Sequence, residues 1–120
     1  MKKIVLVLLL GIATITFAFS RSVVVDAASN ATPKYIMWGS YVEDVLEKRV
    51  PYRQAHLDGL TEQKESGVLI TIGPTKDNTK VFGIYEAENE ETVRQLIEND
   101  PYWQNGIWTE YEVKEWVQAF

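Results

Sequence analysis

The chain has no cysteine and one histidine, and both scarcities narrow its chemistry. Without cysteine there is no disulfide framework, no thiolate metal site and no cysteine nucleophile. A single histidine also excludes a zinc site built from several histidines of one chain. Basic residues are fewer than acidic ones, 12 against 17, and they are scattered. The net charge of −5 therefore argues against nucleic acid as a partner, because phosphates require clustered lysines and arginines.

The N-terminal segment 1–27 has the layout of a secretory signal peptide. Lys2 and Lys3 precede an uncharged run that is short for a membrane span. Small residues allow cleavage after Ser20 or after Ala27, and an uncleaved membrane anchor is the alternative. We therefore expect a secreted or periplasmic protein with no stable membrane association after cleavage. A spacer at 28–33 then leads into a single domain at 34–120.

Hydrophobic periodicity over the domain predicts the order β-α-β-β-α-β. Short β-rich or alternating runs predict strands, and apolar residues at three-four spacing predict helices. Pro51 and Gly67 mark the beginning and end of the helix that carries the histidine, and Asn89 is placed to cap the last helix. The predicted strands are 34–39, 68–75, 80–87 and 107–117, and the predicted helices are 42–49, about 51–66, and 90–98. This order is typical of an α+β, ferredoxin-like fold, a four-stranded antiparallel sheet with two helices on one face.

The tryptophans are more numerous than one small core needs. They are Trp38, Trp103, Trp108 and Trp116. The alternation of strand 107–117 places Trp108 on its polar side. One face of the sheet is uncovered in this fold, so a homodimer that joins two sheets face to face would bury exposed tryptophans.

His56 is the first candidate for proton chemistry near neutral pH. Its helical spacing from Tyr52 and Leu60 turns the ring into or beside the packed face of the helix. A carboxylate partner has to come from another element, and Asp100, held extended before Pro101, is the best candidate. Such a pair can act as a general base or acid. The plainer alternative is a satisfied, half-buried histidine and an aspartate that only marks the end of a helix.

Arg53 precedes His56 by three residues on the same flank, so it could bind an anionic group, and Tyr102 could line the same pocket. For the arginines the sequence nevertheless favours surface ion pairs. These would join Arg49 and Arg53 to the neighbouring acidic residues, Glu43, Asp44 and Glu47. No phosphate-cradling glycine loop, Ser-His-Asp arrangement or metal cluster is visible, so we expect no cofactor and no metal.

Several motifs in order resemble the YCII-related (YciI-like) domain family. They are "LEKR", "R-x-x-H-L", the strand that opens into Gly73-Pro74, and "DPY…G", and the resemblance covers 34–120. It implies a ferredoxin-like domain that dimerises into an α+β barrel. It also implies an active site whose histidine and aspartate correspond to His56 and Asp100. One activity described in the family is dehydrochlorination of a chlorinated hydroxyquinol.

The chain departs from the family pattern in its export signal and in the turn "GSYVED", which lacks an aspartate-containing loop that would form one polar wall of a pocket. Whether the protein is an enzyme therefore stays open. The favoured hypothesis is a cofactor-independent enzyme of the isomerase or lyase type that moves a proton on a small cyclic or aromatic compound. His56 would move the proton, Asp100 would orient the ring, and Arg53 and Tyr102 would contact the substrate. The alternative is an exported dimeric module that binds a small ligand, or has a structural role, without catalysis.

Overall fold

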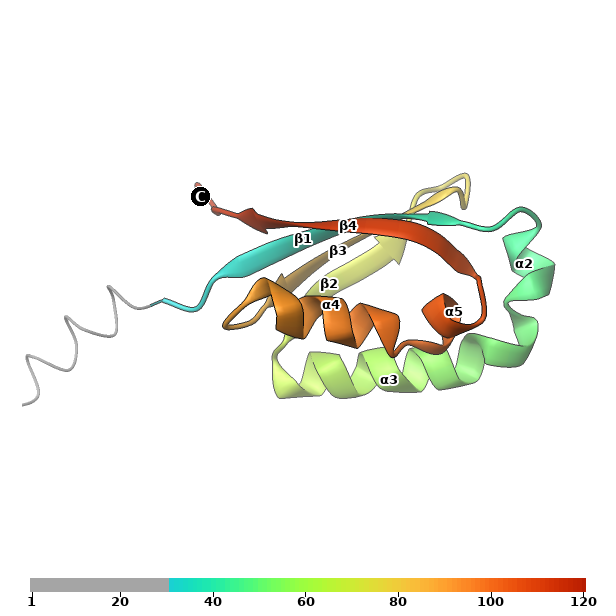
Figure 1. The fold of residues 1–120 in the computed structure, drawn as a ribbon, viewed down its shortest axis with the longest axis horizontal. Helices are drawn as coiled ribbons and strands as arrows, with labels where there is room; N and C mark the ends of the chain where they lie inside the picture. Colours follow the sequence, from blue (N-terminus) through green and yellow to red (C-terminus); the bar gives the residue numbers. More distant parts are fainter. Residues whose placement is uncertain (1–30) are drawn as a thin grey trace, which may run out of the picture. The chain divides into compact units, whose positions relative to one another are not determined.

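The computed structural model describes residues 31–120, and its elements follow the predicted order (Figure 1). The predicted signal peptide, with both cleavage positions, lies outside the described residues. The strands are β1 (Lys34–Tyr41), β2 (Leu69–Pro74), β3 (Lys80–Glu86) and β4 (Trp108–Trp116). The helices are α2 (Val45–Lys48), the 3-10 turn η1 (Val50–Tyr52), α3 (Arg53–Ser66), α4 (Glu90–Glu98) and α5 (Pro101–Gln104). Within the described range, no helix has the length and apolar character needed to cross a membrane.

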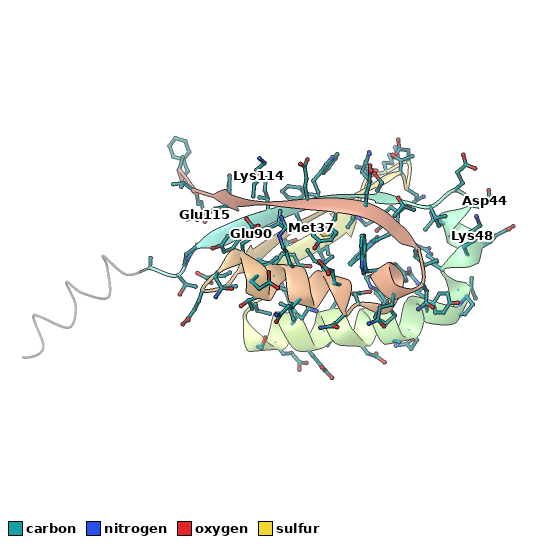
Figure 2. All side chains as sticks on the ribbon, in the orientation of Figure 1. Met37, Asp44, Lys48, Glu90, Lys114 and Glu115 are labelled. Carbon is teal, nitrogen blue, oxygen red and sulfur yellow. The ribbon has the colours of Figure 1, made fainter. Side chains whose placement is uncertain are left out.

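The strands form one antiparallel sheet in the order β2-β3-β1-β4, so the first strand of the domain lies inside the sheet. The helices α3 and α4 lie on the same side of the sheet and leave its other side open (Figure 1). Side chains alternate along β1: Tyr35 and Met37 are buried, whereas Trp38 is 40% exposed. Figure 2 shows Met37 between the sheet and α4, and Lys114 on the opposite face. The predicted ferredoxin-like α+β fold is confirmed.

Local sequence signals set the ends of the helices. Pro51 lies in η1, and α3 follows at once and ends before Gly67, whose φ of 88° is the left-handed conformation that glycine adopts most easily. Asn89 caps α4 by accepting a hydrogen bond from the backbone N–H of Thr92 at 2.9 Å. Pro101 begins the additional short helix α5, which the sequence did not predict. Proline fits the first turn of a helix because its missing N–H would have no partner there.

Trp108 is buried, which corrects its predicted place on the polar side of the last strand. The register between β1 and β4 shifts here: Ser40 pairs with Glu110, whereas Tyr41 pairs with Trp108. Thr109 is thus the extra residue of a β-bulge, and the alternation of side chains changes sides across it. Trp108 therefore turns into the core and is only 2% exposed.

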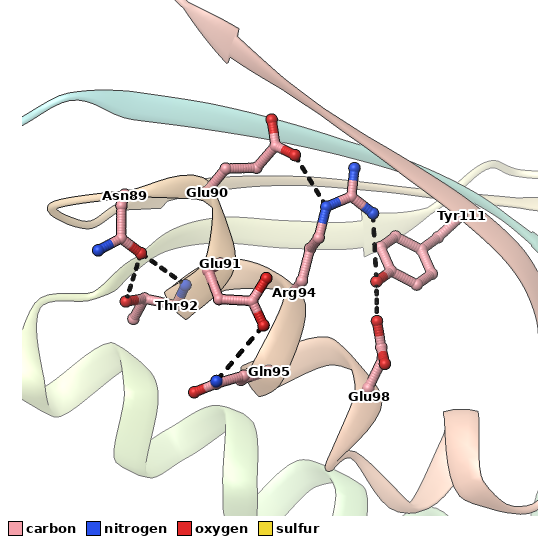
Figure 3. A network of polar contacts seen from close by, with 8 residues as sticks. All are labelled: Asn89, Glu90, Glu91, Thr92, Arg94, Gln95, Glu98 and Tyr111. Carbon is pink, nitrogen blue, oxygen red and sulfur yellow. Dashed lines mark hydrogen bonds and ion pairs between the residues drawn. The ribbon is translucent and has the colours of Figure 1, made fainter.

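A polar network joins α4 to β4 (Figure 3). The Nε of Arg94 donates to Glu90 at 2.8 Å, and its guanidinium lies over the ring of Tyr111, 5.5 Å from the centroid. The Tyr111 hydroxyl donates to Glu98 at the end of α4. Burial and the Glu98 carboxylate raise the pKa of Tyr111, so its hydroxyl remains a donor at neutral pH. The network holds α4 along β4 and so helps to position Asp100, which follows the helix.

Candidate active site

His56 and Asp100 come from different elements, and the fold brings them into direct contact. His56 is buried on α3, and Asp100 lies in the short connection between α4 and α5. The Nδ1 atom of His56 is 2.8 Å from Oδ1 and 2.9 Å from Oδ2 of Asp100. Each residue is 6% exposed. The structure thus brings together the two residues that the sequence pairs.

The backbone around Asp100 directs its carboxylate. Asp100 is extended, with φ −71° and ψ 137°, and its Oδ1 accepts the backbone N–H of Tyr102 at 2.8 Å as the N-cap of α5. An ionised carboxylate only accepts hydrogen bonds, so the contact places the hydrogen of a neutral imidazole on Nδ1. The Nε2 atom of His56 then carries the free lone pair, and it forms no hydrogen bond with residues 31–120. In this tautomer the ring can accept a proton from a substrate.

Aromatic side chains fix the plane of the imidazole. The ring of Tyr102 stacks on His56 with centroids 3.6 Å apart and planes 6° apart. The indole of Trp108 meets the same imidazole edge-on, at 5.2 Å and 88°. Burial, and to a lesser degree the charge of Asp100, raise the pKa of Tyr85. His56 and Asp100 therefore lie in a closely packed apolar environment, in which charges interact more strongly than in water.

The imidazole lines a pocket of about 180 Å³ beneath one end of the sheet. Its walls come from the end of β1, the segment from α2 into α3, the end of β2, and the beginning of β4. The lining residues are Tyr41, Arg49, Arg53, His56, Leu57, Leu60, Ile72, Gly73, Pro74, Val81, Tyr102 and Trp108. The predicted substrate-contacting residues Arg53 and Tyr102 are thus both at this pocket. No aspartate or glutamate belongs to the lining, so its permanent charges are those of the two arginines.

The arginines do not form the surface ion pairs that the sequence favoured. Among residues 31–120, neither Arg49 nor Arg53 has an acidic partner within ion-pair distance. Because α2 ends at Lys48 and the chain turns through η1 before α3 begins, Arg53 does not share a helix with the acidic residues of 43–47. Both guanidinium groups are left available to an anionic ligand. In the same part of the chain, no three His, Cys, Asp or Glu side chains are placed to hold a metal ion.

Within the turn "GSYVED", Tyr41 contributes a phenol to the pocket lining, although no aspartate of this turn does so. Its position follows the inward alternation of Tyr35, Met37 and Gly39 along β1. That alternation could have identified Tyr41 from the sequence, had the strand been extended past Gly39. Pro74, the last residue of β2, also lines the pocket.

The fold and this site define a class of protein: a ferredoxin-like α+β domain with a buried histidine–aspartate contact at a pocket. Residues 34–117 match the YCII-related domain family, and the chain belongs to this family. The resemblance found in the sequence motifs is thereby confirmed.

Two related proteins align with this chain over nearly all of their own length. An uncharacterized protein of Haemophilus influenzae is 26% identical over 96 residues, covering 72% of this chain and 98% of that protein. The solved structure of 5-chloro-2-hydroxyhydroquinone dehydrochlorinase (TftG) from Burkholderia phenoliruptrix AC1100, in complex with 2,5-dihydroxybenzoquinone, is 27% identical. It superposes with a TM-score of 0.63 and covers 72% of this chain and 95% of that one.

Proposed function

We propose that this protein is a cofactor-independent enzyme that moves a proton on a small cyclic or aromatic compound in an isomerase- or lyase-type reaction. The observation that carries the proposal is the contact of His56 with both carboxylate oxygens of Asp100 at the wall of a pocket. His56 is the general base, Asp100 orients it, Arg53 binds an anionic group, and Tyr102 forms the wall behind the ring.

The arrangement suits a reaction that begins with proton abstraction. The free lone pair of His56 Nε2 takes a proton from a carbon of the substrate, whose electron pair moves onto a conjugated oxygen, or from a hydroxyl, whose electron pair stays on that oxygen. The imidazolium that forms is stabilised by Asp100, as a carboxylate stabilises the histidine of a catalytic triad. An isomerase then returns the proton to another atom, whereas a lyase expels a leaving group with its electron pair.

The structural relative supports this class of substrate. TftG is a dehydrochlorinase of a chlorinated hydroxyhydroquinone, and its solved complex holds a benzoquinone. The pocket of the present chain, at about 180 Å³, is of a size for one six-membered ring with substituents, since an engineered cavity of about 150 Å³ holds benzene. The substrate class is therefore chemically consistent with the volume and the aromatic walls of the pocket.

The experiment is turnover by the parent protein and by His56→Gln and Asp100→Asn variants. Chloride release from 5-chloro-2-hydroxyhydroquinone is one assay, and hydrogen–deuterium exchange of small cyclic ketones, followed by NMR, is a broader one. Loss of a general base lowers rates by about 100-fold or more. Gln54→Ala, an exposed change on the same helix, is the matched control and should leave the rate unchanged.

A parent rate that survives in His56→Gln would refute the catalytic role. Specific binding of such compounds by the parent, with no turnover of any of them, would instead favour a non-catalytic binding module.

We also infer that the chain forms a homodimer through the open face of its sheet. On that face Trp38 is 40% exposed and Phe82 is 38% exposed, and their rings meet edge-on at 6.4 Å. Contiguous exposed aromatic surface favours association. A Trp38→Lys change should convert the dimer to a monomer in light scattering, whereas Leu57→Lys, on helix α3 at the other side of the sheet, should not. A monomeric parent protein would refute this inference.

Export is part of the same proposal and rests on the N-terminal sequence 1–27. Expression of the full chain should give a shorter mature protein outside the cytoplasm, with its N-terminus after Ser20 or Ala27. Mass spectrometry of the fractionated protein measures this directly. A full-length product that stays in the cytoplasm would contradict it.

A further inference from the structure

Tyr41 is a polar residue of the pocket to which the proposed function gives no role. It ends β1, where its backbone N–H donates to the carbonyl of Thr79 at 2.9 Å and where β1 pairs with β4 at Trp108. These backbone contacts anchor the residue on two sides. Its side chain lines the pocket together with His56.

The Tyr41 hydroxyl is available to a ligand. Its O–H donates to no acceptor within residues 31–120, although the neighbouring Trp108 indole N–H interacts with its oxygen, and the residue is only partly buried. The Tyr102 hydroxyl and the Trp108 indole nitrogen, in contrast, are sealed from solvent. Of the tyrosine and tryptophan polar groups at the pocket, Tyr41 is thus the one that a ligand can reach.

The surroundings of Tyr41 keep its phenol protonated. Burial raises its pKa, and Tyr102 and the charge of Asp100 add to the rise, while a hydrogen bond from the Trp108 indole and the charge of Arg49 offset part of it. The ordinary tyrosine pKa is already 10.0, so at neutral pH the group is a hydrogen-bond donor. A neutral donor can stabilise a negative oxygen without introducing a charge of its own.

The charges around the pocket indicate what such a donor would meet. Arg49 and Arg53 line it, and no carboxylate does. Asp100 contacts Nδ1 of His56, whereas the free nitrogen is Nε2. The pocket therefore favours a small planar compound with negative or strongly polarised oxygens, because the two arginines attract its charge and no carboxylate of the lining repels it.

We propose that the Tyr41 hydroxyl donates a hydrogen bond to a substrate oxygen, and that with Arg49 and Arg53 it makes the pocket selective for small planar oxyanions. The inference rests on the proposed function, since it names the substrate class of the same site. When His56 takes a proton, the electron pair that moves onto the conjugated oxygen is stabilised by the Tyr41 O–H. Tyr41 is thus a substrate-contacting donor, and its loss weakens binding of the charged form.

The test is calorimetric binding of 2,5-dihydroxybenzoquinone, an anion at neutral pH, to the parent protein and to tyrosine variants. Tyr41→Phe keeps the ring and removes the hydroxyl, and it should weaken binding about fivefold to tenfold, the effect of one hydrogen bond. Tyr41→Asp should weaken it further, because it adds a negative charge to the lining. Tyr35→Phe, on the same strand and sheet face but outside the pocket, should bind like the parent.

Thermal melts of the variants show that each is folded before binding is compared. Equal affinity of the parent protein and Tyr41→Phe would overturn the role of the hydroxyl. Tighter binding by Tyr41→Asp, or no binding by the parent, would overturn selectivity for oxyanions. Either failure is distinguishable from failure of the proposed function, because that function is tested by comparing proton exchange in the parent protein and in His56→Gln, both of which keep Tyr41.

Discussion

Replacement of Asp100 separates two structural contributions of one side chain. Its Oδ1 accepts the backbone N–H of Tyr102 at 2.8 Å and so begins α5, and the same carboxylate contacts His56 at 2.8 and 2.9 Å. Asp100→Ala removes both interactions. Asp100→Asn keeps an oxygen for the cap, because asparagine is as good an N-cap as aspartate, and removes only the charge.

The expected magnitudes follow from these contacts. Loss of an N-cap costs about 0.5–2 kcal/mol. Loss of a hydrogen bond to a charged group costs about 1.5–3 kcal/mol. Asp100→Ala should therefore lower the free energy of unfolding by about 2–5 kcal/mol, and Asp100→Asn by about 1 kcal/mol, the difference between a charged and a neutral hydrogen bond. A domain of ordinary stability, about 5–15 kcal/mol, survives the asparagine change, and it survives the alanine change unless its stability lies at the lower end of this range.

Urea unfolding at neutral pH, followed by tryptophan fluorescence, measures these values. A double-mutant cycle with His56→Gln isolates the contact itself, and a coupling energy of about 1–3 kcal/mol is expected for such neighbours. A coupling near zero would show that the two side chains do not stabilise each other. Equal destabilisation by the alanine and asparagine variants would refute the separate contribution of the cap.

Other predictions concern positions away from the pair. Burial raises the pKa of Tyr85, so ionisation of its phenol favours the unfolded state. The free energy of unfolding should therefore fall as the pH rises past the ordinary tyrosine pKa of 10.0, and Tyr85→Phe should reduce this pH dependence in unfolding titrations. Gly39→Ala should destabilise by about 1–3 kcal/mol, since its Cβ would lie 2.8 Å from the carbonyl oxygen of Glu110, and an unchanged melting temperature would contradict this. Gly59→Ala, with nothing within 4 Å, should instead stabilise its helix by about 0.5–1 kcal/mol in the same melts. Asn89→Ala should cost about 1 kcal/mol in urea unfolding, and no change would refute its capping role.

The fold was predictable from the sequence because its signals are local and agree with one another. Residues 90–98 form the predicted helix with the same bounds, since Asn89 caps it and Val93 and Ile97 make one buried stripe. The bulge at Thr109 was not predictable in the same way. It arises from how β4 pairs with β1, and a change of register between two strands leaves no mark in the alternation of either strand alone.

The candidate site was predictable in part for the same reason. Pro101 held Asp100 extended at the end of a helix, and that local constraint identified the carboxylate that the structure places against His56. The pocket depends instead on long-range packing. Arg49 faces it because the chain turns through η1, and Tyr41 reaches it because β1 extends past Gly39. The position of Arg49 does not follow from spacing along the sequence, and that of Tyr41 follows only once the strand is known to continue past Gly39.

The placement of the pair supports chemistry better than it supports stability. A buried ionic contact is seldom the most stable way to fill a core, because removing both charges from water costs about as much as their attraction returns. Apolar residues of similar size between α3 and α5 would pack as well against Trp108. An imidazole is useful there because one nitrogen faces a carboxylate while the other is left without a hydrogen-bond partner among residues 31–120, at a pocket lined by arginines. In the proposed function, the His56–Asp100 contact holds the general base in one tautomer, and the aromatic rings around it fix its direction.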